Sequence, residues 1–387
     1  MMESAPLHRL EQVRNQLHEH QLDCVALVPG FNLRYIAGID FMMLERPIIL
    51  FIPADALKIP VLVIPELEAA NWKHIAAFEA QLFPWSDETG PDDAMRQAAQ
   101  ALHGMRNLGV EHLRMRVLEA DLISRFMPEI RVLKGETVLN PLRLHKDGLE
   151  LASHRKAVQV CEASLEEVVS NLSPGESERQ ICSRLTSTIL KHGGESTPIE
   201  ALVLSGPNSG SPHGRSGERQ VVPGDILLFD FVTTVNGYYA DITRTFMVGR
   251  EPDEQMYSVY NAVKSANAAG RAAVRPGVTC QEVDRAARQV LVNAGFGSHF
   301  THRTGHGLGL DVHEEPGIVE GNKMRLEEGM VFTIEPGCYI EGWGGIRIED
   351  DVVVANTGCE CLTTFDRELR IIGCKKRGKT IHPISSL

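Results

Sequence analysis

The sequence predicts two domains, an α/β domain over residues 1–140 followed by an α+β domain over residues 141–387. In the first domain short apolar runs alternate with amphipathic segments, which is the pattern of strands alternating with helices. In the second domain long amphipathic segments precede groups of apolar runs, and this helices-then-strands order occurs twice. Asn140-Pro141 and Gly148 interrupt the pattern between the two, which places the boundary there. A chain of 387 residues, 43% of them hydrophobic, is long enough for two or three buried cores.

The first domain is expected to alternate helix and strand from one end to the other. Its helical segments repeat apolar residues at helical spacing, as in "LHRLEQVRNQLHEH", and its strand segments are short apolar runs such as "CVALV". In chain order we expect a helix at 7–20, strands at 24–28, 47–53 and 61–65, a helix at 92–105, a strand at 107–111, a helix at 118–127 and a strand at 130–134.

The second domain begins with a long helical segment, and a glycine pair ends the next one. Strands follow, then two more helices, then the last strands. In chain order we expect helices at 148–172 and 177–194, a strand at 201–206, a hairpin at 227–246, helices at 253–274 and 280–296, and strands at 329–340 and 344–354. This order is typical of an α+β catalytic domain.

Composition and charge limit the classes of function. The chain carries 51 acidic and 39 basic residues, a net charge of −12, which argues against a general affinity for nucleic acid or anionic membranes. The short basic run at 374–379 is expected to be a solvated tail. The N-terminus lacks the apolar core of a signal peptide, and no apolar run approaches ~18 residues. We therefore expect a soluble cytoplasmic protein whose eight cysteines are reduced.

Two aspartates lie inside apolar runs on either side of a predicted hairpin turn. The Asn-Gly pair at 236–237 is a strong signal for a two-residue turn. Pairing outward from this turn places Asp230 opposite Thr243 and Val232 opposite Asp241. Both aspartates then lie on one face of the hairpin as diagonal neighbours, with Cα atoms roughly 7–8 Å apart.

These aspartates need a partner. Asp230 lies in the apolar run "ILLFDF". Burying a carboxylate without a partner costs roughly several kcal/mol. A shared cation satisfies both acids. From the hairpin alone, metal binding and a structural pairing with an arginine such as Arg244 are equally good interpretations.

Further acids occur in two later apolar segments. Glu335 lies in "GMVFTIEPGCYI", and Arg347 and Glu349 are two apart in "GGIRIEDDVVV", which places them on one face of a strand. Each is a weak signal alone, because a glutamate on a strand usually faces solvent.

A glycine-rich segment, "HRTGHGLGLDVHEEP", supplies His302, His306 and His313. Its glycines allow the backbone to approach a site closely. A single histidine here would more often be a structural hydrogen-bonding group. One or two of these imidazoles together with the four acids, however, form an oxygen-rich set that suits Mn²⁺, Co²⁺, Fe²⁺ or Zn²⁺. The excess of acids fits two ions about 3.5–4 Å apart.

The motifs together resemble those of the pita-bread metallopeptidases, a family that includes Xaa-Pro dipeptidase (prolidase), aminopeptidase P, methionine aminopeptidase and the metal-free creatinase. "DFVTTVNGYYADITRTF" resembles the family's two-aspartate hairpin, "GHGLGLDVHEEP" its histidine motif, and "FTIEPG" and "GIRIEDDVVV" its two glutamate motifs. "NLRYIAGID" is similar to a stretch in the creatinase-type N-terminal domain, which methionine aminopeptidase normally lacks. The resemblance implies a pita-bread catalytic domain preceded by this smaller α/β domain.

The resemblance also implies the roles of individual residues. Metal ligands of two ions, with Mn²⁺ or Co²⁺ preferred over Zn²⁺ or Fe²⁺, would be Asp230, Asp241, His306, Glu335 and Glu349. A hydroxide held between the ions would attack the scissile bond, and Glu335 would carry its proton to the leaving amine. His213 and His313 would contact the substrate and assist catalysis. His302 and Arg347 would meet the C-terminal proline or its carboxylate, although Arg347 equally suits a role in orienting the glutamates.

The implied activity is hydrolysis of the Xaa-Pro bond in dipeptides or short peptides by a homodimeric enzyme. Cleavage at the N-terminus of longer peptides, as in aminopeptidase P, and action on a small non-peptide metabolite are the alternatives. A binding module without catalysis is disfavoured because all five ligand positions are filled. One departure from the family is Val232, where a small residue or glycine is usual, and it is expected to reshape the pocket wall.

Overall fold

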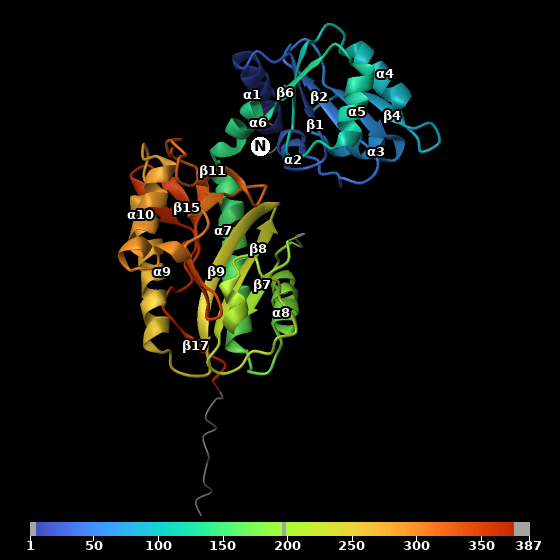
Figure 1. Ribbon diagram of the computed structural model, residues 1–387. Coiled ribbons are helices and arrows are strands. Elements are labelled where there is room, and N and C mark those ends of the chain that lie inside the picture. The colour runs from blue at the N-terminus through green and yellow to red at the C-terminus, as the bar shows by residue number, and fades with distance from the viewer. Residues whose placement is uncertain (1–4, 196–198, 375–387) are drawn as a thin grey trace, which may run out of the picture. The chain divides into compact units, whose positions relative to one another are not determined.

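The computed structural model describes residues 5–195 and 199–374, so most of the basic run at 374–379 lies outside the described residues. The chain divides into two compact units, Met1–Arg143 and Leu144–Leu387 (Figure 1). In the part of the chain that is described, no helix combines the length and the apolar character needed to cross a membrane.

The first unit is a mixed six-stranded sheet with helices between its strands (Figure 1). The strand order is β4-β3-β2-β1-β5-β6. β1 pairs antiparallel with β2 and parallel with β5, so the direction of neighbouring strands changes between β2 and β1 at the centre of the sheet. The elements are α1 (Ala5–Glu19), β1 (Cys24–Leu27), α2 (Phe31–Ala37), β2 (Ile49–Pro53), β3 (Val61–Pro65), α3 (Glu66–Ile75), β4 (Gln81–Trp85), α4 (Asp92–Ala101), β5 (Asn107–Val110), α5 (Val117–Phe126), β6 (Arg131–Lys134) and α6 (Glu136–Leu144).

The expected elements of this unit are all present, and the sequence patterns missed α2, α3, β4 and α6. The prediction that Asn140-Pro141 interrupts the secondary structure is wrong, because both residues lie inside α6. A proline within a helix removes one backbone hydrogen bond. The helix nevertheless buries Val138 and Leu139 on its inner face, and that burial favours the helical conformation here.

The second unit contains two similar layers, each a sheet with a pair of helices packed against it (Figure 1). The first layer contains α7 (Gly148–Ser170), α8 (Glu178–Lys191), β7 (Leu202–Ser205), η1 (Gly206–Gly210), β8 (Ile226–Val235), β9 (Tyr238–Val248) and the short β17 (Ile371–Ile372), in sheet order β17-β9-β8-β7. Asp147 caps α7 and Ser177 caps α8, each in a capping box, which fixes where both helices begin.

The second layer contains α9 (Glu254–Ala273), α10 (Cys280–Asn293), η2 (Gly297–His299), β10 (Gly305–Gly307), β11 (Glu314–Ile318), β12 (Val331–Ile334), β15 (Asp350–Ala355) and β16 (Gly358–Cys361), in sheet order β11-β10-β12-β15-β16. A separate two-stranded ribbon pairs β13 (Gly337–Ile340) with β14 (Gly344–Arg347). The repeated helices-then-strands order seen in the sequence therefore corresponds to these two layers.

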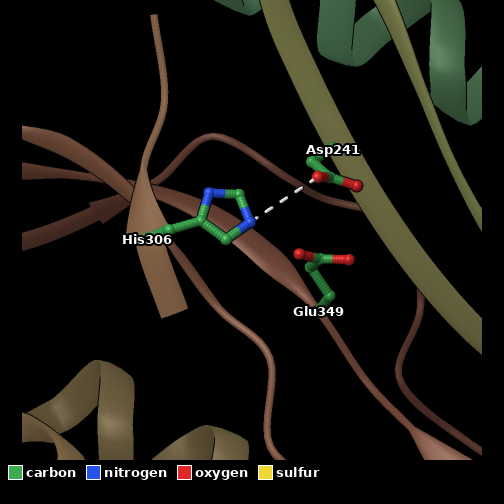
Figure 2. Close-up of side chains that lie close together, drawn as sticks. All are labelled: Asp241, His306 and Glu349. Carbon is green, nitrogen blue, oxygen red and sulfur yellow. Dashed lines mark ion pairs between the residues drawn. The ribbon is translucent and has the colours of Figure 1, made fainter. Parts of the chain in front are cut away.

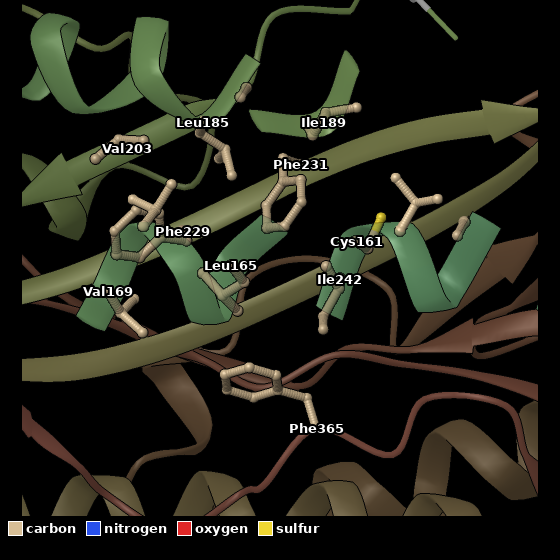
Figure 3. Close-up of a cluster of buried hydrophobic side chains, with 14 of the residues drawn as sticks. Cys161, Leu165, Val169, Leu185, Ile189, Val203, Phe229, Phe231, Ile242 and Phe365 are labelled. Carbon is tan, nitrogen blue, oxygen red and sulfur yellow. The ribbon is translucent and has the colours of Figure 1, made fainter. Parts of the chain in front are cut away.

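The core of the first layer lies between the helices α7 and α8 and one face of the β7-β8-β9 sheet (Figure 3). Phe229 and Phe231 of β8 point into it, together with Ile242 of β9 and Leu165 of α7. Because side chains alternate along a strand, the residues between them face the opposite side of the sheet. That opposite side carries Asp230.

The hairpin has the predicted register. Asp230 pairs with Thr243 and Val232 with Asp241, and both residues of the 236–237 turn have positive φ, as this turn type requires. The alternative in which Arg244 pairs with these aspartates is wrong. Arg244 follows Thr243 on the strand and faces the other side of the sheet, where it forms a buried ion pair with Asp350 at 2.8 Å.

Candidate metal centre

The two glutamates of the site lie where the chain passes from one sheet to another. Glu335 lies between β12 and β13, and Glu349 lies between β14 and β15. The prediction that Arg347 and Glu349 share one strand is therefore wrong, because β14 ends at Arg347 and a new strand of a different sheet begins at Asp350.

Backbone hydrogen bonds hold both crossing points. The amide of Glu335 donates to the carbonyl of Thr304 at 2.7 Å, and the amide of Glu349 donates to the carbonyl of Thr243 at 3.1 Å. Each glutamate is thereby anchored beside another part of the site, Glu335 next to the histidine segment and Glu349 next to the aspartate hairpin. Segments distant in sequence meet at this place.

His306 lies on β10, and the residues on either side of it are glycines because other backbone segments approach too closely for a side chain. A Cβ on Gly305 would lie 1.8 Å from the carbonyl oxygen of Thr333, and a Cβ on Gly307 would lie 2.2 Å from that of Glu315. The imidazole Nδ1 lies 3.2 Å from the Gly307 carbonyl oxygen. This contact favours the tautomer with the proton on Nδ1, which leaves the lone pair of Nε2 free to bind a metal.

The Nε2 atom of His306 faces the acids (Figure 2). It lies 3.9 Å from Oδ2 of Asp241 and 3.5 Å from Oε1 of Glu335. One ligand atom from each of Asp241, His306 and Glu349 lies within 4.8 Å of the others, and all three residues are buried. Figure 2 shows the two carboxylates and the imidazole converging on one small space.

Asp230 lies beside this group but is bound differently. Its Oδ2 accepts a hydrogen bond from Nη2 of Arg347. The structure therefore brings all five predicted ligands into one region, with Asp241, His306 and Glu349 as the tight cluster, Glu335 against His306, and Asp230 paired with an arginine.

The protonation of the cluster reflects its burial and its crowded negative charge. Burial, together with the charges of neighbouring acids, raises the pKa of Asp241 and of Glu349 well above the usual range. Burial raises the pKa of Glu335 to about 7. Burial also lowers the pKa of His306 well below its usual value, so its imidazole is neutral at neutral pH.

These observations fit a divalent cation. Oδ1 of Asp241 is buried and has no hydrogen-bond partner among the residues that the structure describes. A buried carboxylate oxygen without a partner is costly, and so are several carboxylates held together without positive charge. The mixed carboxylate and imidazole donors suit Mn²⁺, Co²⁺, Fe²⁺ or Zn²⁺.

The cluster lies at the base of a cavity of ≈ 620 Å³ in the second unit. Every site residue predicted from the sequence lines this cavity, and so does Val232. Apolar residues form another part of its wall. The lining comprises the predicted residues His213, Asp230, Asp241, His302, His306, His313, Glu335, Arg347 and Glu349, together with Ile199, Glu200, Leu202, Pro212, Phe231, Val232, Arg303 and Val312.

The predicted substrate-contacting residues differ in their surroundings. His213 is exposed, and its loop follows η1. The ring of His313 lies edge-on to that of His306, with centroids 4.2 Å apart. Nε2 of His302 lies 2.9 Å from the hydroxyl oxygen of Tyr339, and burial lowers the pKa of His302 to about 4.

Three residues of the site were missed by the sequence patterns. Thr243 donates a hydrogen bond to Glu349 at 2.6 Å, Tyr339 contacts both His302 and Arg347, and Arg303 lines the cavity. Thr243 could have been found, because the predicted register already placed it opposite Asp230. Tyr339 lies on β13, and no spacing in the sequence indicates that this strand turns toward the site.

Comparison with family models assigns both units. The model of metallopeptidase family M24 matches residues 152–356, and that of the creatinase/prolidase N-terminal domain matches residues 9–145. The matches bear out the predicted two-domain, creatinase-like architecture.

Individual proteins are similar over nearly the whole chain. The probable dipeptidase PepE of Mycobacterium tuberculosis is 36% identical over 351 residues, covering 90% of this chain and 92% of PepE. Among solved structures, dipeptidase PepE from Mycobacterium ulcerans has a TM-score of 0.88 at 34% identity, covering 96% and 99% of the two chains. A recombinant prolidase from Thermococcus sibiricus has a TM-score of 0.89 at 32% identity, covering 94% and 98%.

Proposed function

The chain belongs to metallopeptidase family M24, and from this premise we propose that it is a dipeptidase that hydrolyses the Xaa-Pro bond with the help of two divalent ions. One observation carries the proposal: a buried cluster of carboxylates and one imidazole, with an unpartnered oxygen on Asp241, lies at the base of a cavity large enough for a small peptide. Proteins similar over nearly the whole chain include a probable dipeptidase and a prolidase.

The ions would be held by Asp230, Asp241, His306, Glu335 and Glu349, with Mn²⁺ or Co²⁺ as the preferred metals. When bound, they would supply Lewis-acid polarisation of the scissile carbonyl and activation of a water. Burial and the charges of neighbouring acids raise the pKa of Asp241 and Glu349 in the metal-free protein, and bound ions would neutralise that negative charge.

Glu335 is the proposed proton carrier. Its carboxylate lies at the cavity wall, 3.5 Å from His306, and burial brings its pKa to about 7. Glu335 would accept a proton from the attacking water and deliver it to the nitrogen of the leaving amine.

The histidines would bind and orient the peptide. Burial lowers the pKa of His313, so the ring is neutral at neutral pH and can donate one hydrogen bond to the oxygen that becomes negative during attack. His213, on the exposed loop, and His302, held against Tyr339, lie on other parts of the cavity wall and would contact the substrate on either side of the scissile bond.

Arg347 would orient the acids. Its guanidinium donates to Asp230 and to Oγ1 of Thr243, and that hydroxyl in turn donates to Glu349. Through these contacts one side chain positions two of the five predicted ligands.

Apolar side chains in the cavity suit the ring of proline. Val232 from β8 contributes to this wall together with Leu202 from β7 and Val312. A branched side chain at Val232 narrows the space beside Asp241, its partner across the hairpin. A compact proline ring fits such a wall better than a long side chain does.

The test is hydrolysis by the purified protein with added Mn²⁺ or Co²⁺. The substrates would be Ala-Pro, the tripeptide Ala-Pro-Ala, and Ala-Ala, with release of the amino-terminal alanine measured. Turnover of Ala-Pro well above that of the other two supports the proposal. Faster cleavage of the tripeptide would indicate an aminopeptidase, and no turnover of any peptide would favour a non-peptide substrate or a binding role.

Two further properties stay predictions. We expect a homodimer, which sedimentation velocity would test, and a cytoplasmic location, which cell fractionation would test.

A further inference from the structure

A dipeptide carries a free carboxylate close to its scissile bond, and the cavity presents two arginines to it. Arg347 is 3% exposed, and each part of its guanidinium is already bound: Nη2 by Asp230, Nη1 by the hydroxyl of Tyr339, and Nε by Thr243 at 3.1 Å. To bind a substrate carboxylate it would have to give up contacts that hold the acids in place. Arg347 is therefore poorly suited to be the carboxylate receptor.

Arg303 is in the opposite situation. It lines the same cavity and is half-buried. Within residues 5–195 and 199–374, no ion pair or side-chain hydrogen bond involves its guanidinium, including with Glu200, the exposed acid on the cavity wall. Arg303 shares the lining of this cavity with His306 and His313.

The backbone around Arg303 is held firmly. Its carbonyl oxygen lies 2.7 Å from Nδ1 of His302, and the carbonyl of His302 accepts from Arg288 at 2.8 Å. On the other side, Thr304 donates to the buried carboxylate of Asp284 at 2.7 Å. A fixed backbone holds the base of this unpaired side chain at the cavity wall, so that only the side chain itself has to be ordered when an anion binds.

We propose that Arg303 binds the C-terminal carboxylate of the dipeptide and is the residue that makes this enzyme prefer two-residue substrates. A guanidinium forms two parallel hydrogen bonds with a carboxylate, and charge-assisted bonds of this kind are the strong ones. In a tripeptide the same position would hold a neutral amide, which cannot accept this pair. The inference rests on the proposed dipeptidase function and adds the residue that recognises substrate length.

The test compares a free acid with its amide. Steady-state kinetics of Ala-Pro and Ala-Pro-amide would be measured for the wild type, Arg303→Gln and Arg303→Lys, each fully loaded with metal. The matched control is Arg275→Gln, which removes an exposed arginine outside this cavity. For Arg303→Gln we expect kcat/KM for the free acid to fall by about ten- to a hundredfold, mainly through KM, so that the acid-over-amide preference is largely lost. Arg303→Lys should recover part of it.

The outcomes separate this inference from the function on which it rests. An equal loss on acid and amide, or no change in their ratio, would overturn the role of Arg303 while leaving the dipeptidase proposal intact. A second substrate pair, Asp-Pro and Asn-Pro, distinguishes the source of the carboxylate: if Arg303→Gln affects only the preference for Asp-Pro, Arg303 binds an acidic side chain and the proposal is wrong. A wild type inactive on every Xaa-Pro dipeptide would instead remove the proposed function.

Discussion

Thr243 holds Glu349 at two points. The carbonyl of Thr243 accepts from the amide of Glu349 at 3.1 Å, and its hydroxyl donates to Oε2 of the same residue at 2.6 Å. The hydroxyl also accepts from Nε of Arg347 at 3.1 Å. A threonine on the aspartate hairpin therefore links the arginine to a candidate metal ligand, and a side chain without a hydroxyl could not do so.

Thr243→Val should weaken metal binding more than folding. Valine keeps the shape of threonine but removes the bond to Glu349, and loss of a group that orients a metal ligand typically lowers affinity by about 10–100-fold. We expect a decrease of this size in Mn²⁺ affinity by isothermal titration calorimetry. Thr234→Val is the matched control, because Thr234 is buried on the neighbouring strand and its hydroxyl bonds Glu195, away from the site. Equal metal affinity in the two variants would contradict the assigned role.

Metal-free protein should lose stability as the pH rises from about 6.5 to 8.5. Asp241 and Glu349 have raised pKa values, and that of Glu335 rises from 4.5 to about 7, so in this range the folded state holds protons that the unfolded state has released. Stability then falls with pH. The histidines with lowered pKa values oppose this only at the lower end of the range, because a histidine in the unfolded state, with an ordinary pKa near 6.5, is mostly neutral above about pH 7.5.

Differential scanning fluorimetry with and without a chelator would measure this effect. The difference in Tm between Mn²⁺-loaded and chelator-treated protein should grow with pH, because the metal replaces the protons. Asp241→Asn should flatten the dependence. A Tm of chelator-treated protein that rises between pH 6.5 and 8.5 would contradict the assigned electrostatics.

Glu335→Gln should abolish most of the activity while preserving the fold. Glutamine keeps the shape but cannot carry a proton, and general acid–base groups contribute roughly 10²–10⁴-fold. We expect kcat on Ala-Pro to fall by that factor at saturating metal, with metal content determined in the same samples. Glu368→Gln, which alters an exposed ion pair with Lys264, serves as the control. A variant that kept its metal and its kcat would exclude Glu335 as the proton carrier.

Breaking the buried ion pair between Lys146 and Glu314 should lower the free energy of unfolding far more than breaking an exposed ion pair of the same length. Lys146 and Glu314 lie 2.7 Å apart with side chains 2% and 5% exposed. Removing one partner of a buried pair costs about 3–5 kcal/mol, so Lys146→Met should lower the free energy of unfolding by that amount in urea denaturation. Lys191→Met breaks a 2.7 Å pair whose lysine is 65% exposed, and it should cost below ~1 kcal/mol. Similar losses in the two variants would refute this difference.

The hairpin shows what the sequence could predict. The turn at 236–237 fixed the register, and the register placed Asp230 and Asp241 on one face of the hairpin. Because side chains alternate along a strand, Arg244, which follows Thr243, faces the opposite side. Local turn chemistry and side-chain alternation were sufficient here. The remaining candidate ligands came from acids inside other apolar runs and from histidines in a glycine-rich segment, and the resemblance between motifs selected His306 among those histidines.

The surroundings of the ligands could not be predicted in this way. Glu335 and Glu349 lie at changes of sheet, and a continuous apolar run in the sequence gives no sign that the chain leaves one sheet for another. Tyr339 reaches Arg347 only because the β13-β14 ribbon brings the two strands together. Such contacts depend on tertiary packing between segments that are far apart in the sequence.

The two sheets of the second unit contribute different members of the cluster. Asp241 comes from the four-stranded sheet and His306 from the five-stranded one, and these sheets share no strand. An ion bound by both side chains would connect the two layers and oppose transient opening between them. Amide protons in β9 and in β12 would then exchange with solvent more slowly when metal is bound, and the two strands would slow together. Occupancy of one small site would thus reduce opening motions throughout the second unit.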